Sequence, residues 1–141
     1  MSSSKVIPCP GCGAKNRVPA VAEGTPRCAK CQVALPWIAE AGDADYDKVA
    51  DSSRVPVLVD LWAPWCGPCR QLSPLLEQFA VEKAGALKLV KVNVDQSPAT
   101  QARFGVQAIP TLLLFKGGKK VAEQRGALPL AALRNWVNSQ V

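Results

Sequence analysis

Six cysteines are the residues of this 141-residue chain best suited to chemistry. They form three pairs, each with two residues between its members: Cys9 and Cys12, Cys28 and Cys31, and Cys66 and Cys69. A C-x-x-C pair can be half of a zinc site, or it can be a dithiol that exchanges electrons with a disulfide. The chain has no histidine, so spacing and surroundings must decide the use of each pair.

The first four cysteines have the spacing of a structural zinc site. Fifteen residues separate the first pair from the second, and each pair can form a tight turn that presents two sulfurs. Two such turns close a tetrahedron of sulfurs at about 2.3 Å from Zn²⁺, with no open position for catalysis. We therefore predict one structural zinc ion and no organic cofactor. The predicted ligands are Cys9, Cys12, Cys28 and Cys31. Two disulfides or four free thiols are the alternative, and a reducing compartment disfavours disulfides.

The zinc site predicts a division of the chain. Residues 1–35 are too few to fold alone, because segments below about 40 residues usually need a metal or a disulfide. We expect residues 1–35 to form a small zinc-ribbon-like knuckle and residues 36–141 to form a separate α/β domain.

The third pair lies in the segment WCGPC, between an expected strand and an expected helix. Gly67 allows a tight turn and Pro68 opens the helix, so Cys66 stands at a helix N-terminus, where a thiolate is stabilised. We expect Cys66 to be the nucleophile, with a lowered pKa, and Cys69 to resolve the mixed disulfide. A metal at this pair is the alternative, but the other cysteines already complete a tetrahedron.

Hydrophobic patterns predict the remaining elements in the order βαβαβαββα. Expected strands cover 36–40, 55–62, 87–94, 111–115 and 119–125, with helices after residue 42, from Pro68, over 97–104 and from Pro129. Gly117 and Gly118 predict a two-residue hairpin turn, so the sheet should end in an antiparallel pair.

Asp60 is a lone carboxylate in the apolar strand that precedes the C-x-x-C pair. Asp60 precedes Cys66 by six positions, so we expect it to be buried beneath the dithiol. Burial raises a carboxyl pKa, and Asp60 could then accept the proton of Cys69. The alternative is a strand-end aspartate that faces solvent.

Two motifs resemble a known family. The run from Trp62 to Arg70, with Asp60 ahead and Ala108-Ile109-Pro110-Thr111 behind, resembles the thioredoxin family over about residues 36–141. The four-cysteine module, with Asn16-Arg17-Val18-Pro19, resembles the bacterial thioredoxin 2 subgroup, which carries an N-terminal zinc-binding extension. The resemblance implies a five-stranded mixed sheet flanked by helices. It also implies a dithiol that reduces oxidised protein substrates and is reduced again by an NADPH-dependent thioredoxin reductase.

The resemblance also implies roles for single residues. Lys91 would lie near Asp60, although its sequence context alone predicts a solvated strand residue. Trp65 would shield Cys66 and contact substrates. Pro110 would be cis, although trans is the ordinary expectation, and the backbone at Ile109 would pair with an extended substrate. Gly126 would lie on the same docking surface.

Composition excludes several classes of function. The net charge is +6, but no dense basic run is present, so nucleic acid is not an expected partner. No apolar run approaches the roughly 18 residues of a membrane span, and the first ten residues resemble no signal peptide. We expect a cytoplasmic monomer that acts as a protein-disulfide reductase. Competing hypotheses are a redox sensor that releases zinc on oxidation, a nucleic-acid- or protein-binding zinc module, and an oxidising envelope enzyme.

Overall fold

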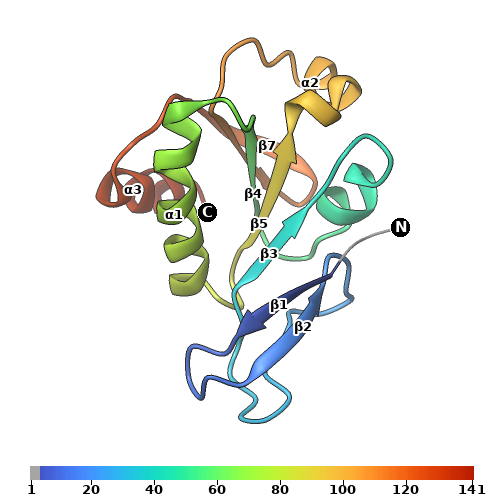
Figure 1. Cartoon of the computed structure of the whole chain (residues 1–141), viewed down its shortest axis with the longest axis vertical. Helices are drawn as coiled ribbons and strands as arrows, with labels where there is room; N and C mark the ends of the chain where they lie inside the picture. Colours follow the sequence, from blue (N-terminus) through green and yellow to red (C-terminus); the bar gives the residue numbers. More distant parts are fainter. Residues whose placement is uncertain (1–3) are drawn as a thin grey trace.

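A five-stranded mixed sheet forms the centre of the computed structural model, which describes residues 4–141 (Figure 1). Its strands lie in the order β3-β5-β4-β6-β7. β3, β5 and β4 are parallel, whereas β6 is antiparallel to both β4 and β7. The strands are β3 (Trp37–Glu40), β4 (Val57–Trp62), β5 (Lys88–Asn93), β6 (Thr111–Lys116) and β7 (Lys119–Arg125). The α/β sheet predicted from the sequence, with its closing hairpin, is confirmed.

Helices cover both faces of this sheet (Figure 1). α1 (Gly67–Glu82) and α3 (Leu130–Gln140) pack on one face, where Leu76 and Leu133 meet Leu58 of β4. The other face packs against the π-helical turn η1 (Asp47–Asp51), with Tyr46 and Val49 beside Val59. On that side a short 3-10 turn, η2 (Val94–Gln96), leads into α2 (Pro98–Arg103). Both faces of β4 are therefore buried. This burial explains why its residues, apart from Asp60, are apolar on both alternating faces.

The structure differs from the sequence prediction at the first helix. The predicted helix after Gly42 is only the single turn η1. Asp43, at the start of the segment where that helix was expected, accepts hydrogen bonds from the backbone amides of Ala99 and Thr100, at 3.1 and 2.8 Å. Its carboxylate thus caps α2, more than fifty positions along the chain, where free amides favour an anion.

The N-terminal segment contains an antiparallel hairpin of β1 (Ser4–Pro8) and β2 (Lys15–Pro19). The first cysteine turn connects β1 to β2, and the second is enclosed by an antiparallel bridge between Arg27 and Ala34. The sequence predicted the two turns but not the strands. Each strand has only five residues, of which at most one is fully buried, so the hydrophobic pattern is weak.

Lys88 joins the N-terminal segment to the sheet. It is only 1% exposed, and its ammonium donates hydrogen bonds to the carbonyls of Ala20 and Val49 while lying 4.1 Å from the centroid of the Trp37 ring. Trp37 in turn donates from Nε1 to the carbonyl of Pro19, at 3.0 Å. Burial lowers the pKa of Lys88 to about 8. The lysine therefore ties the residue that follows β2 to η1 and β3 through groups that are closed to water.

Lys88→Met tests this connection. Methionine fills a similar volume but leaves two buried carbonyls without their donor, and each such loss costs about 1–3 kcal/mol. We expect the free energy of unfolding, measured by denaturant titration, to fall by about 2–4 kcal/mol. Lys48→Met, at an exposed position of η1, is the matched control and should change it by less than about 0.5 kcal/mol. Equal effects of the two substitutions would contradict this account.

Candidate redox site and metal centre

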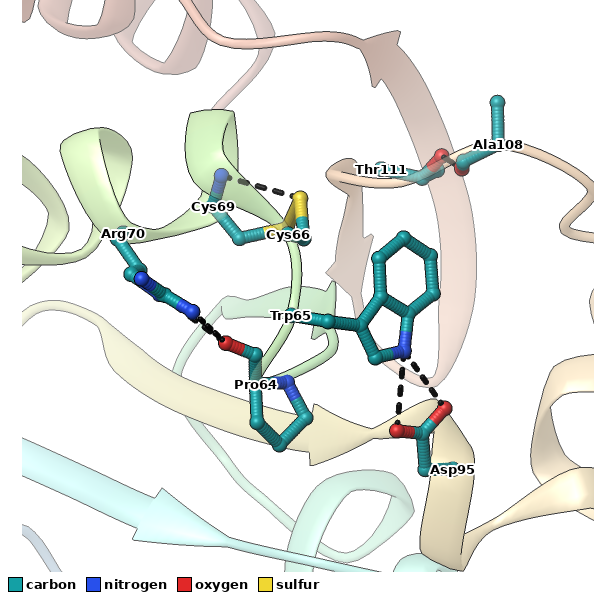
Figure 2. The surroundings of a disulfide bond; sticks show 8 residues. All are labelled: Pro64, Trp65, Cys66, Cys69, Arg70, Asp95, Ala108 and Thr111. Atoms are coloured by element: carbon teal, nitrogen blue, oxygen red, sulfur yellow. Dashed lines mark hydrogen bonds between the residues drawn. A yellow bond between two sulfur atoms is a disulfide. The ribbon is translucent and has the colours of Figure 1, made fainter.

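Cys66 and Cys69 form a disulfide at the N-terminus of α1 (Figure 2). Cys66 is the N-cap residue with extended backbone, and both cysteines are only 4% exposed. The backbone amide of Cys69 donates to Cys66 Sγ, at 3.2 Å. An amide at a helix N-terminus commonly donates to a capping side-chain oxygen. Here the amide donates to this sulfur, and it would stabilise a thiolate after reduction.

Trp65 lies beside the disulfide (Figure 2). It is 66% exposed, whereas tryptophan side chains are on average highly buried. Its Nε1 faces both carboxylate oxygens of Asp95, at 3.3 and 3.1 Å. On the other side of the loop, Arg70 donates twice to the carbonyl of Pro64, at 2.7 and 3.0 Å. These bonds hold the loop between β4 and α1, so the apolar indole face is presented next to Cys66.

The segment before β6 lies across from the disulfide (Figure 2). The peptide bond between Ile109 and Pro110 is cis, as the family resemblance implied. The Pro110 carbonyl accepts from the backbone amide of Gly126, at 2.9 Å, and Gly126 has a φ of +84° that favours glycine. A backbone hydrogen bond therefore joins Pro110 and Gly126, two of the residues predicted to form the docking surface.

Asp60 is buried, with only 2% of its surface exposed. It lines a cavity of about 160 Å³ together with Trp62, Cys69, Arg70, Ser73 and Lys91. Its Oδ1 has no hydrogen-bond partner among the described residues. Burial raises the pKa of Asp60 to about 7, against the opposing attraction of Lys91. The carboxyl group can thus change protonation near neutral pH in a cavity shared with Cys69.

Ser73 is a member of this cavity that the sequence analysis missed. Its Oγ accepts a hydrogen bond from Lys91 Nζ, at 2.6 Å. Ser73 is four residues after Cys69 on α1, and this spacing puts both side chains on the same side of a helix. That spacing was the available sequence signal, but the partner on β5 could be seen only in the folded chain.

The four N-terminal cysteines form a cluster in which all sulfurs lie within 4.8 Å of one another. The Sγ atoms of Cys9 and Cys31 are 3.5 Å apart, and those of Cys12 and Cys28 are 3.7 Å apart. A tetrahedral zinc site with Zn–S bonds of about 2.3 Å needs sulfurs about 3.8 Å apart. The cluster therefore has the ligand type, number and spacing that fit one Zn²⁺.

Backbone and side-chain amides surround these sulfurs. Cys28 Sγ accepts from the amides of Cys31 and Lys30 and from the side chain of Asn16, at 3.5, 3.4 and 3.5 Å. The amide of Cys31 is the main cause that lowers the pKa of Cys28 to about 6. Asn16 also accepts from the amide of Ala29, at 3.0 Å, so it links β2 to the second cysteine turn. Such outer contacts orient cysteine ligands and stabilise their thiolate form.

Within residues 4–141, none of the helices combines the length and the hydropathy that a membrane crossing requires.

Comparison with known proteins agrees with this geometry. A sequence model of the thioredoxin family matches residues 37–139. A thioredoxin of Haemophilus influenzae is 52% identical over 99 residues, which cover 70% of this chain and 92% of that protein. Thioredoxin 1 of a Nostoc species is 45% identical over 95 residues, covering 67% and 89%. A chloroplastic M-type thioredoxin of Pisum sativum is 43% identical over 99 residues, covering 70% and 58%. The chain belongs to the thioredoxin family and is a thiol–disulfide oxidoreductase.

Proposed function

We propose that this chain reduces protein disulfides through Cys66 and Cys69, as a monomer of the thioredoxin 2 type that carries a zinc-binding module. The observation that carries the proposal is the amide of Cys69 on Cys66 Sγ at the start of α1. This contact stabilises a thiolate on Cys66 and leaves Cys69, which lines the cavity of Asp60, as the resolving partner.

The reaction proceeds in two exchanges. The Cys66 thiolate attacks one sulfur of the substrate disulfide, forming a mixed disulfide, and the other substrate sulfur leaves as a thiolate that takes up a proton. Cys69 then loses its proton, attacks Cys66 Sγ and releases the second substrate sulfur. The substrate disulfide gains two electrons and the dithiol is oxidised to the disulfide seen here. An NADPH-dependent thioredoxin reductase would restore the dithiol.

Two neighbouring groups support these steps. Asp60 is the group in the cavity able to accept the proton of Cys69, because its pKa of about 7 lies near physiological pH. Lys91 acts on Asp60 by its charge. Gly67 and Pro68 shape the first turn of α1, which fixes both sulfurs. Oxidised protein substrates would dock on Trp65, Ile109, Pro110 and Gly126.

The substrate would bind as an extended strand before β6. Ile109 lies outside the strands and helices, and within residues 4–141 its backbone makes no hydrogen bond to another backbone group. Its polar groups are therefore free to pair with an extended partner. The exposed indole of Trp65 adds apolar contact area beside the reacting sulfur.

Residues 1–35 would be the zinc-binding module and residues 36–141 the thioredoxin domain. The four clustered sulfurs would hold one Zn²⁺, which would supply structural cross-linking and no redox chemistry. Free cysteines at this cluster suit a reducing compartment, so we place the chain in the cytoplasm. Cys12 and Cys31 are exposed, and this exposure favours a second role in which oxidation of the thiolates releases the metal.

Single cysteine substitutions separate the two sulfur roles. Cys66→Ser should reduce the rate of insulin-disulfide reduction to the background, because no thiolate remains to attack. Cys69→Ser should form mixed disulfides through Cys66 that persist on non-reducing gels, because the resolving thiol is lost. If Cys66→Ser kept measurable turnover, or if Cys69→Ser trapped nothing, the assignment of roles would be wrong.

Asp60→Asn tests the buried carboxyl group. The folded pKa of about 7 exceeds the unfolded value near 3.8, so the unfolded state loses its proton first and stability falls as pH rises from about 4 to 7. Asparagine removes this loss. At pH 8 the free energy of unfolding of the variant should exceed that of the native protein by up to about 4 kcal/mol. At pH 4 the two free energies of unfolding should be similar.

The same variant should reduce disulfides more slowly at neutral pH, with a changed pH profile, because Cys69 loses its proton acceptor. Glu77→Gln removes an exposed carboxylate from α1 and serves as the matched control for both measurements. An unchanged pH profile for Asp60→Asn would make Asp60 a structural residue only.

Metal content tests the zinc assignment. The native chain should carry one zinc per molecule by elemental analysis, and Cys9→Ser/Cys12→Ser should carry none tightly bound, because two sulfurs cannot close the site. Cys66→Ser/Cys69→Ser is the control with the same number of changes and should keep its zinc. A tightly bound zinc in the first variant would refute the ligand set. Mild oxidant should release the metal from the native chain together with the loss of four thiols.

A further inference from the structure

The ammonium of Lys91 binds a neutral hydroxyl although a buried carboxyl group shares its cavity. Asp60 and Lys91 are directly paired on the neighbouring parallel strands β4 and β5, and both line the 160 Å³ cavity under Cys69. The ammonium donates to Ser73 Oγ, at 2.6 Å, and lies 5.9 Å from the centroid of the Trp62 ring. Within the described chain, no carboxylate oxygen lies within 4.0 Å of Lys91 Nζ. The lysine is thus near Asp60 without forming an ion pair with it.

Four ionisable side chains line the cavity, from β4 and from the two elements α1 and β5 that pack against it. They are Asp60 itself on β4, Cys69 and Arg70 on α1, and Lys91 on β5. The guanidinium of Arg70 is exposed and bonded to the carbonyl of Pro64. Lys91 is the cation whose attraction acts on the Asp60 carboxylate. The position of the Lys91 ammonium therefore controls the positive charge that Asp60 experiences.

We propose that Ser73 is a positioning residue that holds the Lys91 ammonium over the Asp60 cavity and so sets the charge next to the proton acceptor of Cys69. The inference rests on the proposed function, since it assigns to Ser73 a role in the same reduction. Ser73 is suited to this because it is half-buried, lies on the rigid helix α1 and offers a hydroxyl one turn beyond Cys69. Its contact is made through Lys91, so it touches no reacting atom.

Loss of the hydroxyl has a definite physical consequence. A lysine ammonium without a partner at a half-buried site moves into water on its flexible stem. The Asp60 carboxylate then loses part of the attraction that favours its charged form, and it keeps its proton to a higher pH. At neutral pH a smaller fraction of molecules would hold a carboxylate able to take the proton of Cys69. Reduction should slow at pH 7 and recover as pH rises.

The test is a titration of Asp60 itself, followed by the carbon-13 shift of its side-chain carboxyl group in the full-length protein. In Ser73→Ala the midpoint should rise by about 0.5 to 1 pH unit, as expected when a unit charge moves several ångströms further away. Ser73→Thr restores a hydroxyl and should titrate as the native protein does. Ser139→Ala removes a serine hydroxyl from the exposed end of α3 and should also leave the midpoint unchanged.

A double-mutant cycle separates positioning from a general change in packing. Lys91→Gln should raise the midpoint by itself, and adding Ser73→Ala to it should produce no further rise, because Ser73 acts through the lysine. The proposal is overturned if Ser73→Ala leaves the midpoint unchanged or lowers it, or if it still raises the midpoint in the Lys91→Gln background. Insulin-disulfide reduction by the native protein is measured in parallel. Its absence would refute the proposed function, whereas normal reduction with an unmoved midpoint would refute the role of Ser73 alone.

Discussion

The site depends on one constraint, which is that β4 is covered on both faces and paired with a neighbouring strand along both edges. The strand is paired with β5 and β6 and covered by helices on each face, so its carboxyl end is fixed in space. Cys66 follows this end by four residues, and Lys91 is aligned with Asp60 through the parallel pairing. Because β6 runs antiparallel, its first residue Thr111 pairs with Leu61, and this pairing brings Pro110 back to the same end.

The same burial makes the site unfavourable for stability. A carboxyl group placed in an apolar strand with an unpaired oxygen would be replaced by an apolar residue if stability alone mattered. Its pKa near 7 is useful only to a protein that must move a proton close to neutral pH. Lys88 is the contrasting case, because its buried ammonium donates to two carbonyls. The contrast identifies Asp60 as a position where chemistry and stability oppose one another.

The sequence predicted what depends on local patterns and failed where distant residues meet. Hydrophobic patterns and the Gly117-Gly118 turn predicted all five strands of the main sheet, and cysteine spacing predicted the sulfur cluster. The contact of Asp43 with α2, the bond between Ser73 and Lys91, and the burial of Lys88 each join residues far apart in the chain. Lys88 and Lys91 both resemble exposed residues of an alternating strand, and only the covering elements show that one is buried. The cis form of the bond before Pro110 was predicted from family resemblance, since trans is the ordinary state of such a bond.

The hairpin β1–β2 has a consequence for aggregation. The main sheet has two edges, and an exposed edge can pair with a strand of another molecule. At one edge, β7 carries Lys119, Lys120 and Arg125, and its pairing with β6 is interrupted between Leu114 and Phe115. The other edge, β3, contains the apolar run Trp37-Ile38-Ala39 and lies against β1, with Lys5 paired to Glu40 at 3.7 Å. Charge and irregularity protect the first edge, whereas the cysteine-bearing hairpin covers the second, so a molecule that loses this hairpin presents an apolar strand edge to its neighbours.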